Sequence, residues 1–473
     1  MFVKISLITS ALLFCSVSLS QVTEYLPLKQ KPQLELDVDT LLLLAESAVT
    51  TRPIAIKQIK SAYSKVCTDI EYPVCNRIKP YLKSSNLQIK QAEITVQTSD
   101  RERSTLANQR GINYNSDLIT RFSVGGTFND YLAYSVGMQS SDDVIQLEDS
   151  YLSIGTQWGQ LDIGNKPHWF SPFANSSMLI STHAPTITSL SWKGITATSW
   201  LDFNYELFIG ELSESNNIYF QQQLTTGKPL ITGMHFEFSP WTGFSLAVNR
   251  IMQSGGSRAG FDFKELIKAF IDPSGADNTS SELSVDEQFG NQAASIVSKI
   301  DFAGERPFSL YFEYAGEDTS RGSNFRLGNS ALSAGLFIPM LTENIALTFE
   351  WSDWQNAWYA HHVYQDGISN EGNLLGHWAA EYRYRDFNAQ GDAVGAQHWM
   401  LKLNWQANLG NYYVLELNST ENQSYSNYDY SKAYSAKLDW HRSLGDHQIK
   451  SSFELGRDSF TQAFYRFSLG FNW

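Results

Sequence analysis

Aromatic rings and hydrogen-bonding groups are mixed in two short stretches of the chain. Residues 352–359 read Ser-Asp-Trp-Gln-Asn-Ala-Trp-Tyr, and residues 425–430 read Tyr-Ser-Asn-Tyr-Asp-Tyr. Aromatic faces stack on sugar rings, and amides and carboxylates bond to hydroxyl groups, so this mixture favours a carbohydrate site. The candidate polysaccharide contacts are Trp354, Trp358, Tyr359, Tyr425 and Tyr428. Each could instead belong to the aromatic girdle at a membrane interface.

Two arginines in another polar stretch could recognise acidic groups. Arg321 and Arg326 carry guanidinium groups that form charge-assisted hydrogen bonds with anionic sugars. They could equally bridge lipopolysaccharide phosphates or pair with the neighbouring Glu317 and Asp318. Both arginines therefore join the candidate polysaccharide contacts.

The motifs of common enzymes are missing from the sequence, which has no G-x-S-x-G elbow, no Walker loop and no H-E-x-x-H pattern. His361 and His362 are adjacent, and neighbours on a strand point to opposite faces, so we expect them not to share a metal. We therefore expect no catalytic residue, no metal and no cofactor. An enzyme with acidic, histidine and serine side chains at a barrel rim remains the third alternative.

Cys67 and Cys75 are expected to form a structural disulfide. They are close in the sequence, and an oxidising periplasm favours their pairing. A metal site would need further ligands, and only Asp69 and Glu71 lie near them in the chain.

Residues 1–20 have the pattern of a secretory signal peptide. Lys4 supplies a positive start, an apolar run follows, and small residues precede Gln21. The alternative is a lipoprotein signal acylated at Cys15, but Phe14 stands where that signal needs a small residue. No later segment has about 18 unbroken apolar residues, so we expect no transmembrane helix.

The composition favours a barrel over a helical membrane protein. The chain has 473 residues, 14 % of them aromatic, and a mean hydropathy of −0.28, which suits a sheet with aromatic girdles. The formal net charge of −14 argues against nucleic acid as a partner and against a simple anion-attracting pore.

Residues 21–92 predict a small periplasmic helical bundle. Asp37 and Asp39 precede an apolar stretch, as they would at a helix N-terminus. Pro53 opens a second stretch with a period near 3.6, and proline is accepted in a first helical turn. A third helix is expected over residues 74–82.

Residues 93–473 predict an all-β transmembrane barrel of about 18 antiparallel strands, with a range of 18 to 20, because the apolar period becomes two from about Glu93. Residues 345–351 and 399–405 alternate apolar and polar side chains over the length of a tilted membrane strand. The last strand alternates in the same way and ends on an aromatic residue, as outer-membrane barrels commonly do. Its apolar residues are Tyr465, Phe467, Leu469, Phe471 and Trp473.

Strand direction then places the connections. If the last strand runs toward the periplasm, the short turns fall on the periplasmic side and the long loops fall outside. The longest loop, 253–292, contains an apolar helical pattern that would fold over the barrel mouth as a lid, or else touch lipid. The pattern consists of Phe261, Phe263, Leu266, Ile267, Phe270 and Ile271.

Four segments, in this order along the chain, resemble the Wzi-type capsule-assembly family of outer-membrane lectins. They are Arg-Pro-Ile at 52–54, G-N-K-P-H-W-F-S-P-F-A-N-S-S-M-L-I-S-T-H-A-P at 164–185, the segment 277–292 that ends in E-Q-F-G-N-Q, and the segment 364–377 that ends in L-G-H. His183 departs from the asparagine expected in the second segment. The resemblance implies an 18-stranded barrel, a helical bundle plugging its inner end, and no enzymatic activity.

These observations predict an occluded, monomeric outer-membrane lectin whose extracellular loops bind capsular or extracellular polysaccharide and tether it. Outer-membrane lipids and lipopolysaccharide would be its other partners, and nucleic acid would not. The main alternative is a porin or substrate-specific channel, which would carry stable open-channel currents.

Overall fold

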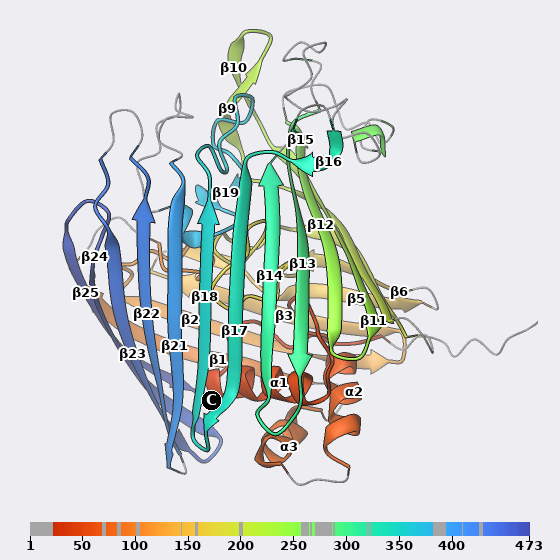
Figure 1. Ribbon diagram of the computed structural model, residues 1–473, viewed down its shortest axis with the longest axis vertical. Coiled ribbons are helices and arrows are strands. Elements are labelled where there is room, and N and C mark those ends of the chain that lie inside the picture. Colours follow the sequence, from red (N-terminus) through yellow and green to blue (C-terminus); the bar gives the residue numbers. More distant parts are fainter. Residues whose placement is uncertain are drawn as a thin grey trace, which may run out of the picture.

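The computed structural model describes most of the chain from Val22 to Trp473. The described residues are 22–68, 72–82, 87–100, 105–142, 144–156, 159–197, 202–256, 264, 267–269, 286, 289–317, 319–320, 323–381, 394–408, 410–424 and 429–473. The predicted signal peptide and most of the predicted helix in loop 253–292 lie outside them. Figure 1 shows a tall barrel with helices gathered at one end and short hairpins at the other. These are called the helix end and the loop end below.

The barrel is one closed antiparallel sheet whose strands follow the order of the sequence. Its strands are β1 (Gln88–Ser99), β2 (Leu118–Asn129), β3 (Leu132–Ser141), β4 (Val144–Leu147), β5 (Ser150–Thr156), β6 (Gly159–Asn165), β7 (Ser189–Ala197), β8 (Asp202–Glu211), β11 (Pro229–Trp241), β12 (Phe244–Gly255), β13 (Asn291–Phe302), β14 (Phe308–Glu317), β17 (Ser330–Thr342), β18 (Ile345–Trp354), β21 (Ala396–Asn408), β22 (Asn411–Asn422), β23 (Ala433–Leu444), β24 (His447–Arg457) and β25 (Ala463–Asn472). Short hairpins are formed by β9 (Ser215–Phe220) with β10 (Gln223–Gly227), β15 (Thr319–Ser320) with β16 (Ser323–Leu327), and β19 (Ser369–Asn370) with β20 (Asn373–Leu374).

The barrel has 18 strand positions, as predicted. The sheet contains 19 separate strands, but β4 and β5 both pair with β3 and occupy one position in succession. β1 pairs with β25, from Glu93 opposite Asn472 to Ser99 opposite Arg466, and this pairing closes the sheet. β1 begins at Gln88 rather than near Glu93. The sequence pattern misses this start because a register shift between Ile89 and Gln91 interrupts the alternation of apolar and polar residues.

The outer face of the sheet carries the apolar side chains. On β25, Tyr465 and Leu469 are each 51 % exposed, whereas Ser468, which points to the other face of the sheet, is buried. The same alternation recurs on strands around the barrel, so the outer face suits lipid and the inner face is polar. The chain is therefore a transmembrane β-barrel. In the part of the chain that the structure describes, no helix is long and apolar enough to cross a membrane.

Three helices and one 3-10 turn precede the sheet: α1 (Pro32–Leu44), α2 (Ile56–Val66), α3 (Pro73–Ile78) and η1 (Lys79–Leu82). The first helix starts earlier than Asp37 and Asp39 suggest, because Pro32 occupies its first turn. Pro53 lies ahead of α2 rather than in its first turn, since the backbone of Arg52 pairs with Trp169.

The two aspartates of α1 hold the helical segment together instead of capping a helix. The Asp37 carboxylate accepts from Arg77 of α3, at 2.6 Å and 2.7 Å. The Asp39 carboxylate accepts from the Arg52 guanidinium at 2.8 Å. Cys67 and Cys75 form a disulfide that joins the end of α2 to α3, with their Cα atoms 5.8 Å apart.

Inside the sheet, two glycines make room for large rings on neighbouring strands. A Cβ on Gly335 of β17 would stand 1.9 Å from Cε2 of Tyr311, which lies on β14. A Cβ on Gly233 of β11 would stand 1.9 Å from Cε1 of Phe208, which lies on β8. Because glycine has no side chain, each ring can lie flat across the next strand and contact whatever enters the barrel.

Candidate functional site

The segment between β6 and β7, residues 166–188, folds into the barrel. Trp169 exchanges backbone hydrogen bonds with Arg52 of the helical part, at 2.9 Å and 3.1 Å. Phe170, Leu179 and Ile180 are buried in a core that also includes inward side chains of β8 through β21. This segment contains the motif that resembles the capsule-assembly family, and it fills part of the lumen. It is called the plug segment below.

A carboxylate on the wall anchors the plug segment. Glu350 of β18 is buried and accepts hydrogen bonds from the backbone N–H groups of Ala174 and Asn175, both at 2.8 Å. It also accepts from the hydroxyl of Tyr311, at 2.8 Å. The backbone of the plug segment therefore has a charged acceptor inside the barrel, at the edge of the cavity described below.

A cluster of buried charges holds the start of the plug segment. The Lys166 ammonium lies 2.9 Å from Asp162 and 3.1 Å from Glu206. The imidazole of His168 lies 2.6 Å from the same Glu206 and stacks on the ring of Phe208. Burial lowers the pKa of His168, and this effect outweighs the hydrogen bond with Glu206, which by itself would raise the pKa. Tyr25 of the N-terminal segment donates to Asp162 at 2.8 Å, so the cluster joins three parts of the chain.

A second segment, residues 355–381, covers the plug segment. The hydroxyl of Tyr359 donates to the Met178 carbonyl at 2.6 Å and accepts from the His377 backbone N–H at 2.8 Å. Ser181 donates through its backbone N–H to the Leu375 carbonyl at 2.7 Å. The two segments, far apart in the sequence, thus form one buried layer.

Three predicted polysaccharide contacts lie inside this layer. Trp354 and Trp358 are 0 % exposed and Tyr359 is 3 % exposed. Their rings pack among apolar side chains of both segments, so no ring face is open to a sugar. The prediction that these three residues stack on a surface glycan is therefore wrong. The mixture of aromatic and polar residues at 352–359 reflects the end of β18 and a turn that enters the barrel, rather than a loop that faces solvent.

The remaining predicted contacts are separate from this layer. Arg326 is exposed on β16 at the loop end, while Arg321, Tyr425 and Tyr428 lie outside the described residues. Glu317, considered as a partner for the arginines, accepts from the Tyr359 backbone N–H at 2.7 Å and from Asn329 at 3.1 Å.

The adjacent histidines behave differently from the prediction. His361 and His362 are not on a strand, and their rings stack with centroids 4.6 Å apart. The argument that they face opposite sides is therefore wrong. Within the described residues, no group of three or more histidine, cysteine and carboxylate side chains could hold a metal ion.

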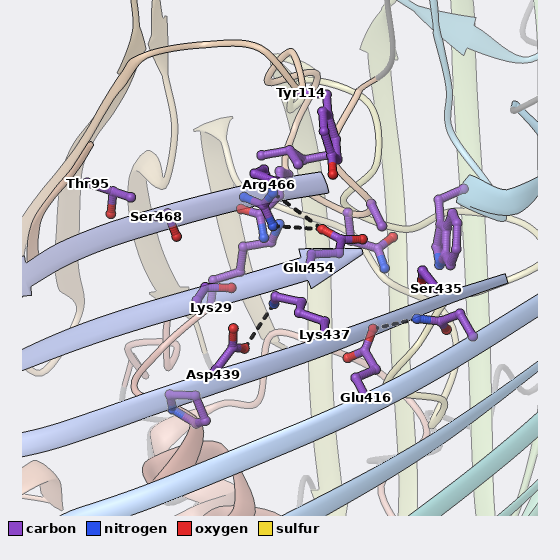
Figure 2. A pocket seen from close by; sticks show the side chains of 18 of the residues that line it. Lys29, Thr95, Tyr114, Glu416, Ser435, Lys437, Asp439, Glu454, Arg466 and Ser468 are labelled. Atoms are coloured by element: carbon purple, nitrogen blue, oxygen red, sulfur yellow. Dashed lines mark hydrogen bonds and ion pairs between the residues drawn. The ribbon is translucent and has the colours of Figure 1, made fainter. Parts of the chain in front are cut away.

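The lumen beside β21–β25, β1 and β2 remains hollow. A cavity of about 390 Å³ lies between this wall and the plug segment, and the N-terminal stretch 29–32 borders it near the helix end. Figure 2 shows its charged wall, where Lys437 pairs with Asp439 at 2.9 Å and Arg466 with Glu454 at 3.1 Å.

The lining of this cavity has more positive than negative side chains. Nine lysines and arginines and five aspartates and glutamates line it, although acidic residues outnumber basic ones by 49 to 35 in the whole chain. Glu93 of β1 is shared between two cations, Lys450 and Arg121. The cavity can therefore attract an anionic group that the rest of the protein would repel.

The sequence carries a signal for this lining in its strands rather than in its loops. Lys437 and Asp439, and likewise Lys450, Ser452 and Glu454, stand at alternate positions on their strands. Inward charges on barrel strands are ordinary by themselves. They indicate a ligand site only when the structure shows that the plug segment fills the other side of the lumen.

The fold and its interior define a class: an 18-stranded transmembrane barrel with a partly filled lumen and helices at one end. The chain belongs to the family described as capsule assembly protein Wzi, whose model matches residues 88–439. A comparison with curated proteins found no match.

Among solved structures, the chain is similar to Escherichia coli Wzi, described as an outer-membrane protein involved in group 1 capsule assembly and a carbohydrate-binding β-barrel. The TM-score is 0.67 with 15 % identity, covering 93 % of this chain and 97 % of that one. The Pseudomonas aeruginosa barrel OccK3 (OpdO) also matches, with a TM-score of 0.48 and 10 % identity over 82 % of this chain and 96 % of that one. These likenesses concern the fold.

Proposed function

We propose that this protein lies in the outer membrane of a Gram-negative-type bacterium, binds capsular or extracellular polysaccharide, and tethers it at the cell surface. The observation that carries the proposal is membership of the capsule-assembly family by a chain whose lumen is occupied by its own plug segment. Barrels of this size form wide aqueous channels when their interior is empty. A filled interior suits retention of a polymer better than diffusion through a pore.

The two ends of the barrel support one orientation. In it, the helix end, which has the short turns, faces the periplasm, and the loop end with the β9–β10 and β15–β16 hairpins faces outward. Arg326, exposed on β16, stays a candidate polysaccharide contact. Many weak contacts along one polymer add up to firm retention, so no single deep sugar pocket is required at the loop end.

The proposal is tested by deleting the gene in a capsulated host and measuring polysaccharide on cells and in the medium. We expect cell-bound polymer to fall and released polymer to rise, with total synthesis unchanged. Complementation with the wild-type gene is the control. Unchanged cell-bound polymer would contradict the tethering role.

A further inference from the structure

The hollow half of the lumen contains a lysine without a hydrogen-bond partner. Within the described residues, the Nζ atom of Lys29 is buried and forms no hydrogen bond. A buried ammonium without a partner is costly, because it has lost its water without gaining an acceptor. Burial, and after it the charges of Arg121 and Arg110, lower the pKa of Lys29 well below its ordinary value. An anion in the cavity would relieve this cost.

A second lysine faces the same space. Lys402 of β21 lines the cavity and, in the part of the chain that the structure describes, has no carboxylate within 4 Å, although the charges of Glu35 and Glu350 act on it from further away. Five other lining cations each have a carboxylate partner, namely Lys90, Arg121, Lys437, Lys450 and Arg466. The remaining two donate to backbone carbonyls, Lys31 to that of Asp446 at 3.2 Å and Arg457 to that of Thr461 at 3.0 Å. Lys29 and Lys402 are therefore the cations left over for a ligand.

Two amide side chains that line the same cavity have unused acceptors. The Asn418 side chain is 8 % exposed and donates to Glu416 at 2.9 Å, while its Oδ1 atom is buried without a donor among the described residues. Oδ1 of Asn108, which also lines the cavity, is likewise buried without a donor among the described residues. An amide oxygen of this kind accepts a hydrogen bond from a hydroxyl group.

We propose that this cavity binds a carboxylate-bearing saccharide, with the ammonium groups of Lys29 and Lys402 facing the carboxylate and Asn418 and Asn108 accepting from hydroxyl groups. This site rests on the proposed polysaccharide-binding function. It adds to that function the kind of sugar bound, an acidic one, and the place of binding, the lumen. The lining extends from Lys31 near the helix end to Arg457 at the end of β24, so the site follows the barrel axis and suits a short length of chain.

A free inorganic anion would satisfy the lysines but not the amides. Hydroxyl donors are what the unused Oδ1 atoms of Asn418 and Asn108 require, and phosphate at neutral pH offers few. The combination of unpartnered cations and unpartnered acceptors therefore favours an acidic sugar over a simple ion.

The test is calorimetric titration of the full-length protein in detergent with tetragalacturonate, its methyl ester, and inorganic phosphate. We expect tetragalacturonate to bind and its neutral ester to bind at least tenfold more weakly. Lys29→Gln and Lys402→Gln should each weaken tetragalacturonate binding by about tenfold, the usual effect of losing one charge-assisted contact. Lys60→Gln is the matched control, because Lys60 is exposed on α2 and does not line the cavity.

Thermal unfolding separates a binding role from a structural one. Lys29→Gln should unfold at the same temperature as the wild type or higher, since it removes a buried charge without a partner. Three results would overturn the site: no binding of tetragalacturonate, equal affinity for acid and ester, or unchanged affinity in both lysine variants. Competition by phosphate at equal concentration would show a free-anion site and overturn the saccharide assignment.

The two proposals fail separately. If the gene deletion releases polymer while tetragalacturonate does not bind, the tethering function stands and the luminal site is wrong. If tetragalacturonate binds through Lys29 while the deletion leaves cell-bound polymer unchanged, the luminal site stands and the tethering function is wrong.

Discussion

Glu350 on the barrel wall binds the plug segment through the two oxygens of its carboxylate. Its two oxygens accept from two backbone N–H groups of the plug segment and from Tyr311. A loop segment without regular secondary structure cannot satisfy its own N–H groups inside a barrel, so the wall must supply acceptors.

Replacing Glu350 with alanine should destabilise the folded protein by about 2 kcal/mol, because two partly buried N–H groups and the buried Tyr311 hydroxyl lose a charged acceptor. Glu350→Gln keeps one acceptor oxygen and should cost less. Thermal unfolding in detergent measures both, with Glu343→Ala at an exposed turn as the control. Equal unfolding temperatures for Glu350→Ala and the control would contradict the anchoring role.

His377 makes stability depend on pH. Burial, and then the nearby His398 and His183, lower the pKa of His377 well below its ordinary value of about 6.5. The unfolded chain therefore takes up a proton below that pH while the folded chain does not. Stability from this residue is complete above about pH 6.5 and is lost as the pH falls below it.

The His377→Asn variant keeps an acceptor for the Ala379 N–H, which the His377 side chain accepts at 3.2 Å. Between pH 7.5 and pH 5.5 the wild type should lose about 1.4 kcal/mol more stability than this variant. Unfolding temperatures at the two pH values measure the difference. Parallel losses in both proteins would mean that His377 is protonated in the folded state.

At the scale of elements, strands are shaped to receive the plug. Tyr311 of β14 can reach Glu350 of β18 only because Gly335 of β17, which lies between them, has no side chain in the path of the ring. β17, which lies between the donor Tyr311 and the acceptor Glu350, therefore needs a residue without a side chain at position 335.

Gly335→Ala should destabilise the protein by about 1–3 kcal/mol, the usual cost of forcing a ring aside in a packed interior. Gly304→Ala is the matched control, because a Cβ there would meet nothing within 4 Å. Thermal unfolding and intrinsic tyrosine fluorescence measure the effect. If both alanine variants unfold alike, the contact with Tyr311 is not tight.

At the scale of the whole molecule, the lumen is divided into a packed half and a hollow half. The core around the plug segment occupies the side of β8–β18, and the cavity occupies the side of β21–β25 and β1. We expect the packed half to limit ion flow, and the proposed ligand would meet the charged walls of the hollow half.

The wild-type protein in planar bilayers should therefore pass far less current than an open barrel of the same size. Glu350→Ala should raise the conductance or its fluctuations, because the plug segment loses its anchor on the wall. Large, steady wild-type currents would instead support the channel alternative and contradict the occluded barrel.

The sequence by itself determined the barrel, its approximate strand number and its outward face. Alternation of period two is a local property, so Tyr465, Phe467 and Leu469 could be assigned to the lipid side without knowing their partners. The helices were also predicted from local pattern, although the roles of Asp37 and Asp39 were not, since Arg77 and Arg52 reach them only in the folded chain.

Only the tertiary structure decided what lies inside. Trp354 and Trp358 have the composition of a surface sugar site, yet they are buried, because residues 355–381 fold inward onto a segment nearly two hundred residues earlier. The unpartnered state of Lys29 likewise depends on which carboxylates the other cations have taken. Burial and pairing are relations between distant parts of the chain, and no local pattern records them.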